Sequence, residues 1–210
     1  MASLAERIVS FFSGNDTAAD EGLRDLFISE LKSVYHTERR AIDALGEQAK
    51  ASTTDEVRNA FLEHQNESIT QKERLEEIFR IIGVRTEERD AAGIDGLIVD
   101  SRRIITDTEP GSLTRDAGLI IAAQKIEHYE IAIYGSLLTL AHVLDFTQST
   151  ELLTKTLAEE KETDRKLTVL AETFVNNRSK QEEDQHPGSH HASRHATVST
   201  DVTLGGSLGV

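Results

Sequence analysis

Four long stretches of this sequence carry apolar residues at the spacing of an amphipathic helix, and polar residues interrupt each pattern near its midpoint. The stretches are residues 21–51, 55–82, 113–144 and 148–176. Their apolar positions recur every three or four residues, which is the period of a helix with one buried face. A buried face that becomes acidic halfway along is costly unless the acids are paired, protonated or bound to metal. The fold must therefore bring partners to these acids.

The four stretches predict an all-α fold in which the helices pack antiparallel as one bundle. The chain has only two prolines and 5% aromatic residues, a composition that favours helices over a sheet. Residues 84–112 separate the second and third helices, and such a connection is long for a plain up-and-down bundle. It carries a brief helical pattern between Leu97 and Ile105. We predict a four-helix bundle with one long crossover connection that contains a short helix.

Three further segments flank the predicted bundle domain of residues 21–177. Residues 1–20 are an N-terminal extension with a short helix, which we expect to pack on the bundle; a docking role for Phe11 and Phe12 is the alternative. Residues 178–201 are polar and rich in histidine, and we expect them to be a disordered linker. Residues 202–210 turn apolar again.

The composition excludes several classes of partner. The chain has 37 Asp and Glu against 23 Lys and Arg, a net charge of -14, whereas nucleic acids and anionic membranes require a basic surface. Cysteine is absent, which excludes disulfides and thiolate ligands and fits a reducing interior. The sequence has neither a long enough apolar run for a membrane span nor a secretory signal. We therefore expect a cytoplasmic protein that binds neither nucleic acid nor membrane.

The polar interruptions coincide in depth, because antiparallel packing brings the helix midpoints into one layer. Glu127 and Glu130 illustrate the pattern, since residues three apart share a helix face and this face is otherwise apolar. We predict that the layer holds two divalent metal ions, because several carboxylates can neutralise their charge. Oxygen-rich sites suit iron or manganese rather than zinc. The predicted ligands are Glu38, Glu67, Glu127, Glu130, Glu160 and Asp164.

Other polar residues near this layer are expected to support the ligands rather than to bind metal. They are Glu30, Tyr35, His64, Gln71, Gln124, His128 and Tyr134. Glu30 lies two turns before Glu38, about 12 Å along the helix axis, so it pairs with a basic residue or supports the ligands from outside. The alternative for any single acid is a paired or capped core residue, and four coincident interruptions favour the metal site.

Several segments resemble the YciF-like ferritin-like family. They are Leu26-Phe27-Ile28-Ser29-Glu30-Leu31, Tyr35 with Glu38, the segment from Gln124 to Glu130, and Glu159 to Asp164. The resemblance implies a ferritin-like bundle, usually dimeric, that is tied to bacterial stress responses and has no firmly established reaction. The stretch Glu127-His128-Tyr129-Glu130 is also similar to rubrerythrins, in which both carboxylates can contact the metals.

The sequence lacks two histidines that the wider superfamily carries. The second and fourth helices of that superfamily each carry Glu-x-x-His, which puts a carboxylate and an imidazole on one face. Here Thr70 follows Glu67 and Thr163 follows Glu160 at that spacing. Ferroxidase or peroxidase activity and the identity of the metal are therefore left open. His64 could replace a missing ligand from one turn earlier.

The C-terminal residues resemble the peptides that load cargo into encapsulin shells. In Leu204-Gly205-Gly206-Ser207-Leu208-Gly209, small residues permit close backbone approach and the two leucines fill apolar pockets. The residues that we expect to bind the shell are Leu204, Gly206, Ser207 and Leu208. The alternative is a frayed tail without a function.

Together these patterns predict a di-metal carboxylate protein that handles iron or peroxide in a stress response. Iron ranks ahead of manganese, dioxygen or peroxide would be the small-molecule partner, and the protein would be a homodimer. The tail would place it inside an encapsulin nanocompartment. Two alternatives remain: manganese catalase-like dismutation of peroxide, and a metal-free helical stress protein that acts by dimerisation and partner binding. Whether the protein is an enzyme is left open.

Overall fold

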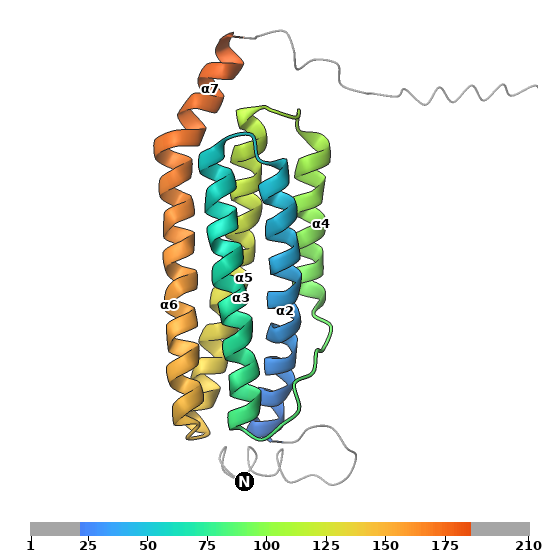
Figure 1. Cartoon of the computed structure of the whole chain (residues 1–210), viewed down its shortest axis with the longest axis vertical. Helices are drawn as coiled ribbons and strands as arrows, with labels where there is room; N and C mark the ends of the chain where they lie inside the picture. The colour runs from blue at the N-terminus through green and yellow to red at the C-terminus, as the bar shows by residue number, and fades with distance from the viewer. Residues whose placement is uncertain (1–21, 186–210) are drawn as a thin grey trace, which may run out of the picture.

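A computed structural model describes residues 22–185, and within this range all regular elements are helices. The four bundle helices are α2 (Leu23–Ala51), α3 (Asp55–Ile81), α5 (Leu113–Val143) and α6 (Thr147–Leu170) (Figure 1). The crossover between α3 and α5 contains α4 (Ala92–Asp107). The predicted all-α bundle with a helix in its long crossover is confirmed. The predicted N-terminal helix and the tail peptide lie outside the described residues.

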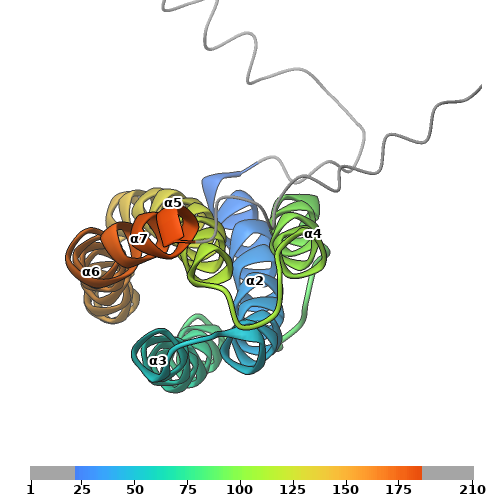
Figure 2. The ribbon, with the colours of Figure 1, turned by 90° about the horizontal axis from the view of Figure 1, so that it is seen from above.

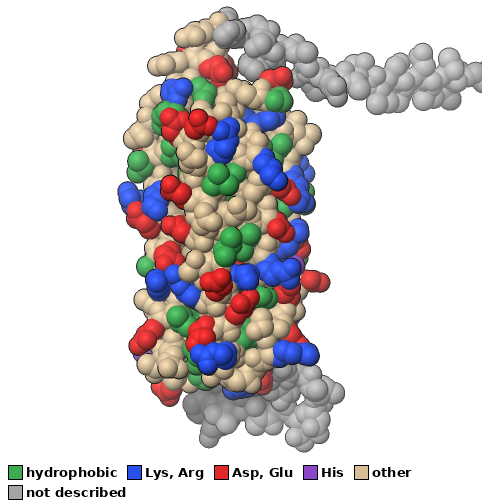
Figure 3. Space-filling view, in the orientation of Figure 1, with side chains coloured by type: hydrophobic (Ala, Val, Ile, Leu, Met, Phe, Trp, Pro, Cys, Tyr) green, Lys and Arg blue, Asp and Glu red, His purple; other side chains and the backbone are tan. Residues whose placement is uncertain are grey.

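The helices surround the bundle axis in the order α2, α3, α6, α5. Each contacts its two neighbours in that order, and α4 packs on α2 and α5 (Figure 2). Because the chain ends α3 at the bottom and begins α5 at the top, the crossover must return along the length of the bundle (Figure 1). The face over α2, α3 and α6 carries acidic and basic side chains in alternation, with small apolar patches between them (Figure 3). Among the described residues, none of the helices is long and apolar enough to cross a membrane.

Buried positions in the bundle helices follow an alternation of steps of four and three residues. The buried residues of α2 that follow it are Phe27, Leu31, Val34, Glu38, Ala41, Leu45 and Gln48, and those of α3 are Val57, Phe61, His64, Ser68, Gln71, Leu75 and Ile78; further buried residues, such as Thr37 and Phe79, lie next to these positions. In α6 they are Ser149, Leu153, Thr156, Glu160, Thr163 and Leu167. This is the heptad spacing of helices that pack nearly parallel to one another. One apolar cluster includes Phe27 and Leu153 and another includes Leu45 and Leu167, and the buried acids lie between them.

The top of the bundle is held in register by a buried carboxylate. Asp116, near the start of α5, accepts hydrogen bonds from the backbone N–H groups of Thr53 and Thr54 at 2.7 and 2.9 Å. The Thr54 hydroxyl caps α3 by accepting from the N–H of Val57. The turn between α2 and α3 is thereby tied to α5, which fixes the relative heights of the helix midpoints.

The last helix extends further than the sequence pattern predicts. The bundle was predicted to end at residue 177, but α6 continues through a π-helical stretch, η1 (Ala171–Val175), into α7 (Asn176–Gln185). The boundary is corrected because α7 has partners on α5: the Glu182 carboxylate accepts from the N–H of Leu113 at 2.8 Å, and Ser179 lies 3.1 Å from Thr114. Residues 178–185 are therefore helical rather than part of a disordered linker.

Candidate metal centre

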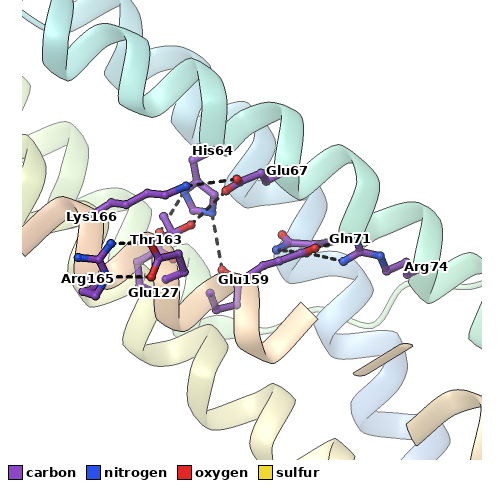
Figure 4. Close-up of polar contacts among 11 residues, drawn as sticks. His64, Glu67, Gln71, Arg74, Glu127, Glu159, Thr163, Arg165 and Lys166 are labelled. Carbon is purple, nitrogen blue, oxygen red and sulfur yellow. Dashed lines mark hydrogen bonds and ion pairs between the residues drawn. The ribbon is translucent and has the colours of Figure 1, made fainter. Parts of the chain in front are cut away.

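Four side chains from three helices converge in the polar layer of the bundle. They are His64 of α3, Glu127 and Glu130 of α5, and Glu160 of α6, and one ligand atom from each lies within 4.8 Å of the others. None of these residues is more than 3% exposed. Nδ1 of His64 lies 3.1 Å from Oε1 of Glu127, and Nε2 lies 3.7 Å from Oε2 of Glu160 (Figure 4). We call these four residues the inner cluster.

Glu38 of α2 adds a further carboxylate in the same layer. It is fully buried, and one of its oxygens accepts a hydrogen bond from the hydroxyl of Tyr134. Tyr134 follows Glu130 by one turn on the buried face of α5 and is itself fully buried. The hydroxyl therefore fixes one oxygen of Glu38 and leaves the other without a hydrogen bond.

The ligand atoms of this layer lack hydrogen-bond partners within the described residues. The unpaired atoms are both ring nitrogens of His64, both carboxylate oxygens of Glu127, Glu130 and Glu160, and Oε2 of Glu38. Buried polar atoms nearly always have a hydrogen-bond partner, so this concentration of donor atoms without one fits a site that can bind a cation. One imidazole and four carboxylates form an oxygen-rich donor set that suits iron or manganese. The residues therefore fit a metal centre.

Electrostatics support the same interpretation. Burial holds the pKa values of Glu38, Glu127 and Glu130 well above the ordinary value of 4.5, and neighbouring carboxylates, Glu160 among them, raise them further. Burial also raises the pKa of Tyr134 well above its ordinary value, and the nearby charge of Glu38 adds to the effect. Bound cations would replace this mutual repulsion with attraction and would favour the ionised carboxylates.

Glu67, a predicted ligand, lies outside the inner cluster. Its side chain is 36% exposed, accepts a hydrogen bond from the Thr163 hydroxyl at 3.1 Å and lies 3.6 Å from Nζ of Lys166 (Figure 4). The inner position on α3 belongs instead to Ser68, because buried residues step from His64 by four and then by three. His64, predicted to support the ligands, is thus among the potential ligands and supplies an imidazole where Glu-x-x-His is absent.

Asp164, another predicted ligand, also faces the edge of the layer. Its side chain is 22% exposed and lies 3.5 Å from Nε2 of His128. The amide of Gln124 donates to it at 3.3 Å and to the Thr168 hydroxyl at 2.8 Å. Thr163 takes the buried position beside it on α6. We call Glu67 and Asp164 the outer pair.

A polar network lies two to three turns from His64 along α3 and within about one turn of Glu160 along α6. Arg74 holds the carboxylate of Glu159 with both terminal guanidinium nitrogens and reaches the Thr156 hydroxyl at 3.2 Å (Figure 4). The amide nitrogen of Gln71 lies 3.5 Å from the same carboxylate, and its amide oxygen is buried without a hydrogen bond. Gln71 therefore lies close to the site, as predicted for a supporting residue, but it bonds away from the inner cluster.

Two other predicted supporting residues lie elsewhere. The Tyr35 hydroxyl donates to Oε1 of Glu76 at 2.9 Å on the side of α3. Glu30 lines a groove between α2 and α5 together with Tyr129. Neither residue contacts the carboxylates of the inner cluster through a hydrogen bond in the described part of the chain.

Comparison with known proteins places the chain in a family. Residues 22–180 match a family model described as a domain of unknown function, DUF892. Protein YciF of Escherichia coli strain K12 is 39% identical over 158 residues, which cover 75% of this chain and 95% of that protein.

Solved structures agree with this match. The crystal structure of the E. coli stress protein YciF is 38% identical with a TM-score of 0.70, covering 74% of this chain and 98% of that chain. YcfI from Rhodopseudomonas palustris is 28% identical with a TM-score of 0.70, and the match covers 73% of this chain and 98% of that chain. A protein from Xanthomonas campestris is 16% identical with a TM-score of 0.61, and the match covers 77% of this chain and 99% of that chain. This similarity concerns the fold alone.

Proposed function

Because the chain belongs to the DUF892 family and is similar to the stress protein YciF, we propose that it is a di-metal carboxylate protein that handles iron or peroxide during stress. The observation that carries this proposal is the set of unpaired, buried ligand atoms on His64, Glu127, Glu130 and Glu160. In a metal-free bundle these buried acids would have few polar partners, and apolar residues in their place would be at least as stabilising.

Charge balance supports two ions rather than one. Glu38 and the three glutamates of the inner cluster carry four negative charges when ionised, which two divalent cations neutralise. His64 would add a neutral imidazole ligand from α3. With Glu38 from α2, the donors would come from all four bundle helices, as in ferritin-like carboxylate proteins.

Iron or manganese held in this layer would supply electron transfer to dioxygen or peroxide. The chain's own residues provide a buried layer between two apolar clusters. Tyr134 keeps Glu38 in place by donating a hydrogen bond from its hydroxyl group. The raised pKa of Tyr134 keeps this hydroxyl group protonated at neutral pH. The outer pair adds negative charge at the surface next to the layer, which attracts cations toward it.

Metal analysis of the full chain tests the proposal. Protein purified without chelator should contain iron or manganese at about two ions per chain, and removal by EDTA should lower the melting temperature. Ligand binding at about 100 times the dissociation constant stabilises a fold by about 2.7 kcal/mol. Absence of metal, with stability indifferent to EDTA and to added metal, would favour a metal-free stress protein. Oxygen evolution from peroxide by the manganese form alone would favour dismutation.

The partners and the compartment form a finer part of the proposal. We expect the protein to be cytoplasmic and to form a homodimer. Light scattering of the purified protein measures the mass of the particle and so tests the dimer. The residues from Leu204 to Leu208 support cargo loading into an encapsulin shell through their sequence alone. Co-expression with a shell protein tests this role, and a chain that ends at Asp201 should not co-purify. Equal co-purification of both chains would exclude it.

A further inference from the structure

The helices α2 and α5 lie side by side, and the line along which they meet is called the seam here. Within residues 22–185, a further helix covers only part of the length of this seam. In the upper part α4 runs beside α2 and α5 (Figure 1). Its residues Ile94 and Ile98 join a buried cluster with Ala41 of α2 and Ile126 of α5. This covering begins at Gly93, where a Cβ atom would lie 2.6 Å from the ring of Tyr129. Below that contact the seam continues as a groove of about 200 Å³, lined by Glu30 of α2 and mainly apolar residues of α5.

Exposed apolar side chains extend both walls of this groove toward the lower end of the bundle. Leu23 and Leu26 precede Glu30 on the same face of α2 and are 48% and 45% exposed. Val143 lies on the stripe of α5 that carries Ser136, and it is 60% exposed. Because α2 and α5 are antiparallel, the start of α2 and the end of α5 meet at the same end. Exposed apolar side chains gathered at one end of a groove are typical of an interaction site.

We propose that this groove is the docking site of the chain's own residues 4–12, bound as a short helix. Leu4, Ile8, Phe11 and Phe12 follow the spacing i, i+4, i+7, i+8, so a helix would present them on one face. Such a helix is about 13 Å long, close to the roughly 16 Å that separate residues 132 and 143 along α5. Residues 13–21 can span up to about 30 Å, so the segment can fold back from the start of α2.

Charge and size favour this occupant over a second copy of the chain. Glu30 has no hydrogen-bond or ion-pair partner in the described part of the chain, and Arg7 flanks the apolar face of the segment. A groove one short helix long offers less area than the roughly 800 Å² per partner that a stable dimer buries. The matching family model begins at residue 22, so the proposed occupant lies outside the family domain. The proposal is independent of the metal centre.

Disulfide trapping tests the docking, because the chain has no native cysteine. Ala5→Cys, which flanks the apolar face, is combined in the full chain with Ser136→Cys at the groove. The matched control combines it with Thr70→Cys, an exposed position on α3, diagonally opposite α5. Docking should make the intramolecular disulfide form about tenfold faster at Ser136 than at Thr70, because the tether is the same in both variants and only docking raises the effective concentration of residue 5 near Ser136.

Adding Phe11→Ser and Phe12→Ser should remove the difference between the two positions. The same change should also increase hydrogen exchange over residues 132–143, which a docked helix would protect. Equal disulfide rates at Ser136 and Thr70 would overturn the proposal. Disulfide-linked dimers that predominate even on dilution would overturn it as well, and would identify a second copy as the occupant.

Discussion

Glu160 and Asp164 lie four residues apart on α6, yet one belongs to the inner cluster and the other to the partly buried outer pair. His64 and Glu67 of α3 show the same contrast at a spacing of three residues. The inner residues lie on the four-three alternation of buried positions, and the outer ones lie one position away from it. In a closely packed bundle, one residue of displacement along a helix therefore separates a potential metal ligand from a solvated acid.

The largest expected effect is the loss of metal when an inner acid is neutralised. Glu127→Gln and Glu160→Gln should each lower metal affinity by more than the roughly 10–100-fold seen when residues that merely support ligands are changed. Glu67→Gln and Asp164→Asn are the matched controls and should keep full occupancy. Inductively coupled plasma mass spectrometry of proteins purified in parallel measures all four. If only the variants Glu67→Gln and Asp164→Asn lost metal, the outer pair rather than the inner cluster would hold it.

Removal of the metal should expose a pH dependence caused by the buried acids of the layer, Glu38 included. The folded-state pKa values of Glu38, Glu127 and Glu130 are raised above 4.5, so between 4.5 and those values the folded protein binds more protons than the unfolded protein. Stability of the metal-free protein should thus fall as the pH rises above about 4.5.

Thermal unfolding in EDTA across this range measures the slope. Glu127→Gln should make it shallower, whereas Glu67→Gln should leave it unchanged. A metal-free protein whose melting temperature rises as the pH is raised above about 4.5 would contradict the expected sign.

A smaller effect is expected at Tyr134, which supports Glu38 without being a ligand itself. Tyr134→Phe removes the hydroxyl that donates to Glu38 and preserves the packing of the ring. We expect metal affinity to fall by about tenfold and the free energy of unfolding by about 1–2 kcal/mol. Tyr35→Phe removes a comparable hydroxyl that bonds to Glu76 instead, so its metal affinity should match that of the unchanged protein. Isothermal titration with manganese separates the two variants.

The smallest effect is expected in the contacts of the outer pair. Lys166→Met removes a partly exposed cation 3.6 Å from Glu67, and exposed ion pairs contribute about 0–1 kcal/mol. Denaturant unfolding should therefore change little, and metal content should not change. A large loss of metal in this variant would show that the inner and outer acids act as one site.

The sequence was sufficient to predict the bundle, because long amphipathic stripes and a long crossover leave few other arrangements. It also located Glu127, Glu130 and Glu160, whose neighbours on the buried stripe are clearly apolar or small. The boundary at residue 177 was wrong because α7 is polar and is held by contacts with the distant start of α5, such as that of Glu182 with Leu113. Such contacts leave no periodic signal.

The placement of Glu67 shows a different limit. Both Glu67 and Ser68 fit a loose helical spacing after His64, and the acidic residue is the more conspicuous candidate. Only the strict alternation of four and three, counted from Val57 through Phe61 and onward to Leu75, assigns the inner position to Ser68. The same count, made on the sequence alone, identifies His64 as an inner residue.

Anomalous diffraction from crystals of the full chain, measured at the iron and manganese edges, tests the central claim most directly. We predict peaks within coordination distance of His64, Glu127, Glu130 and Glu160, with Glu38 beside them. Peaks only beside Glu67 or Asp164, or no peak from protein purified without chelator and supplied with metal, would contradict the assignment of the inner cluster as a metal centre.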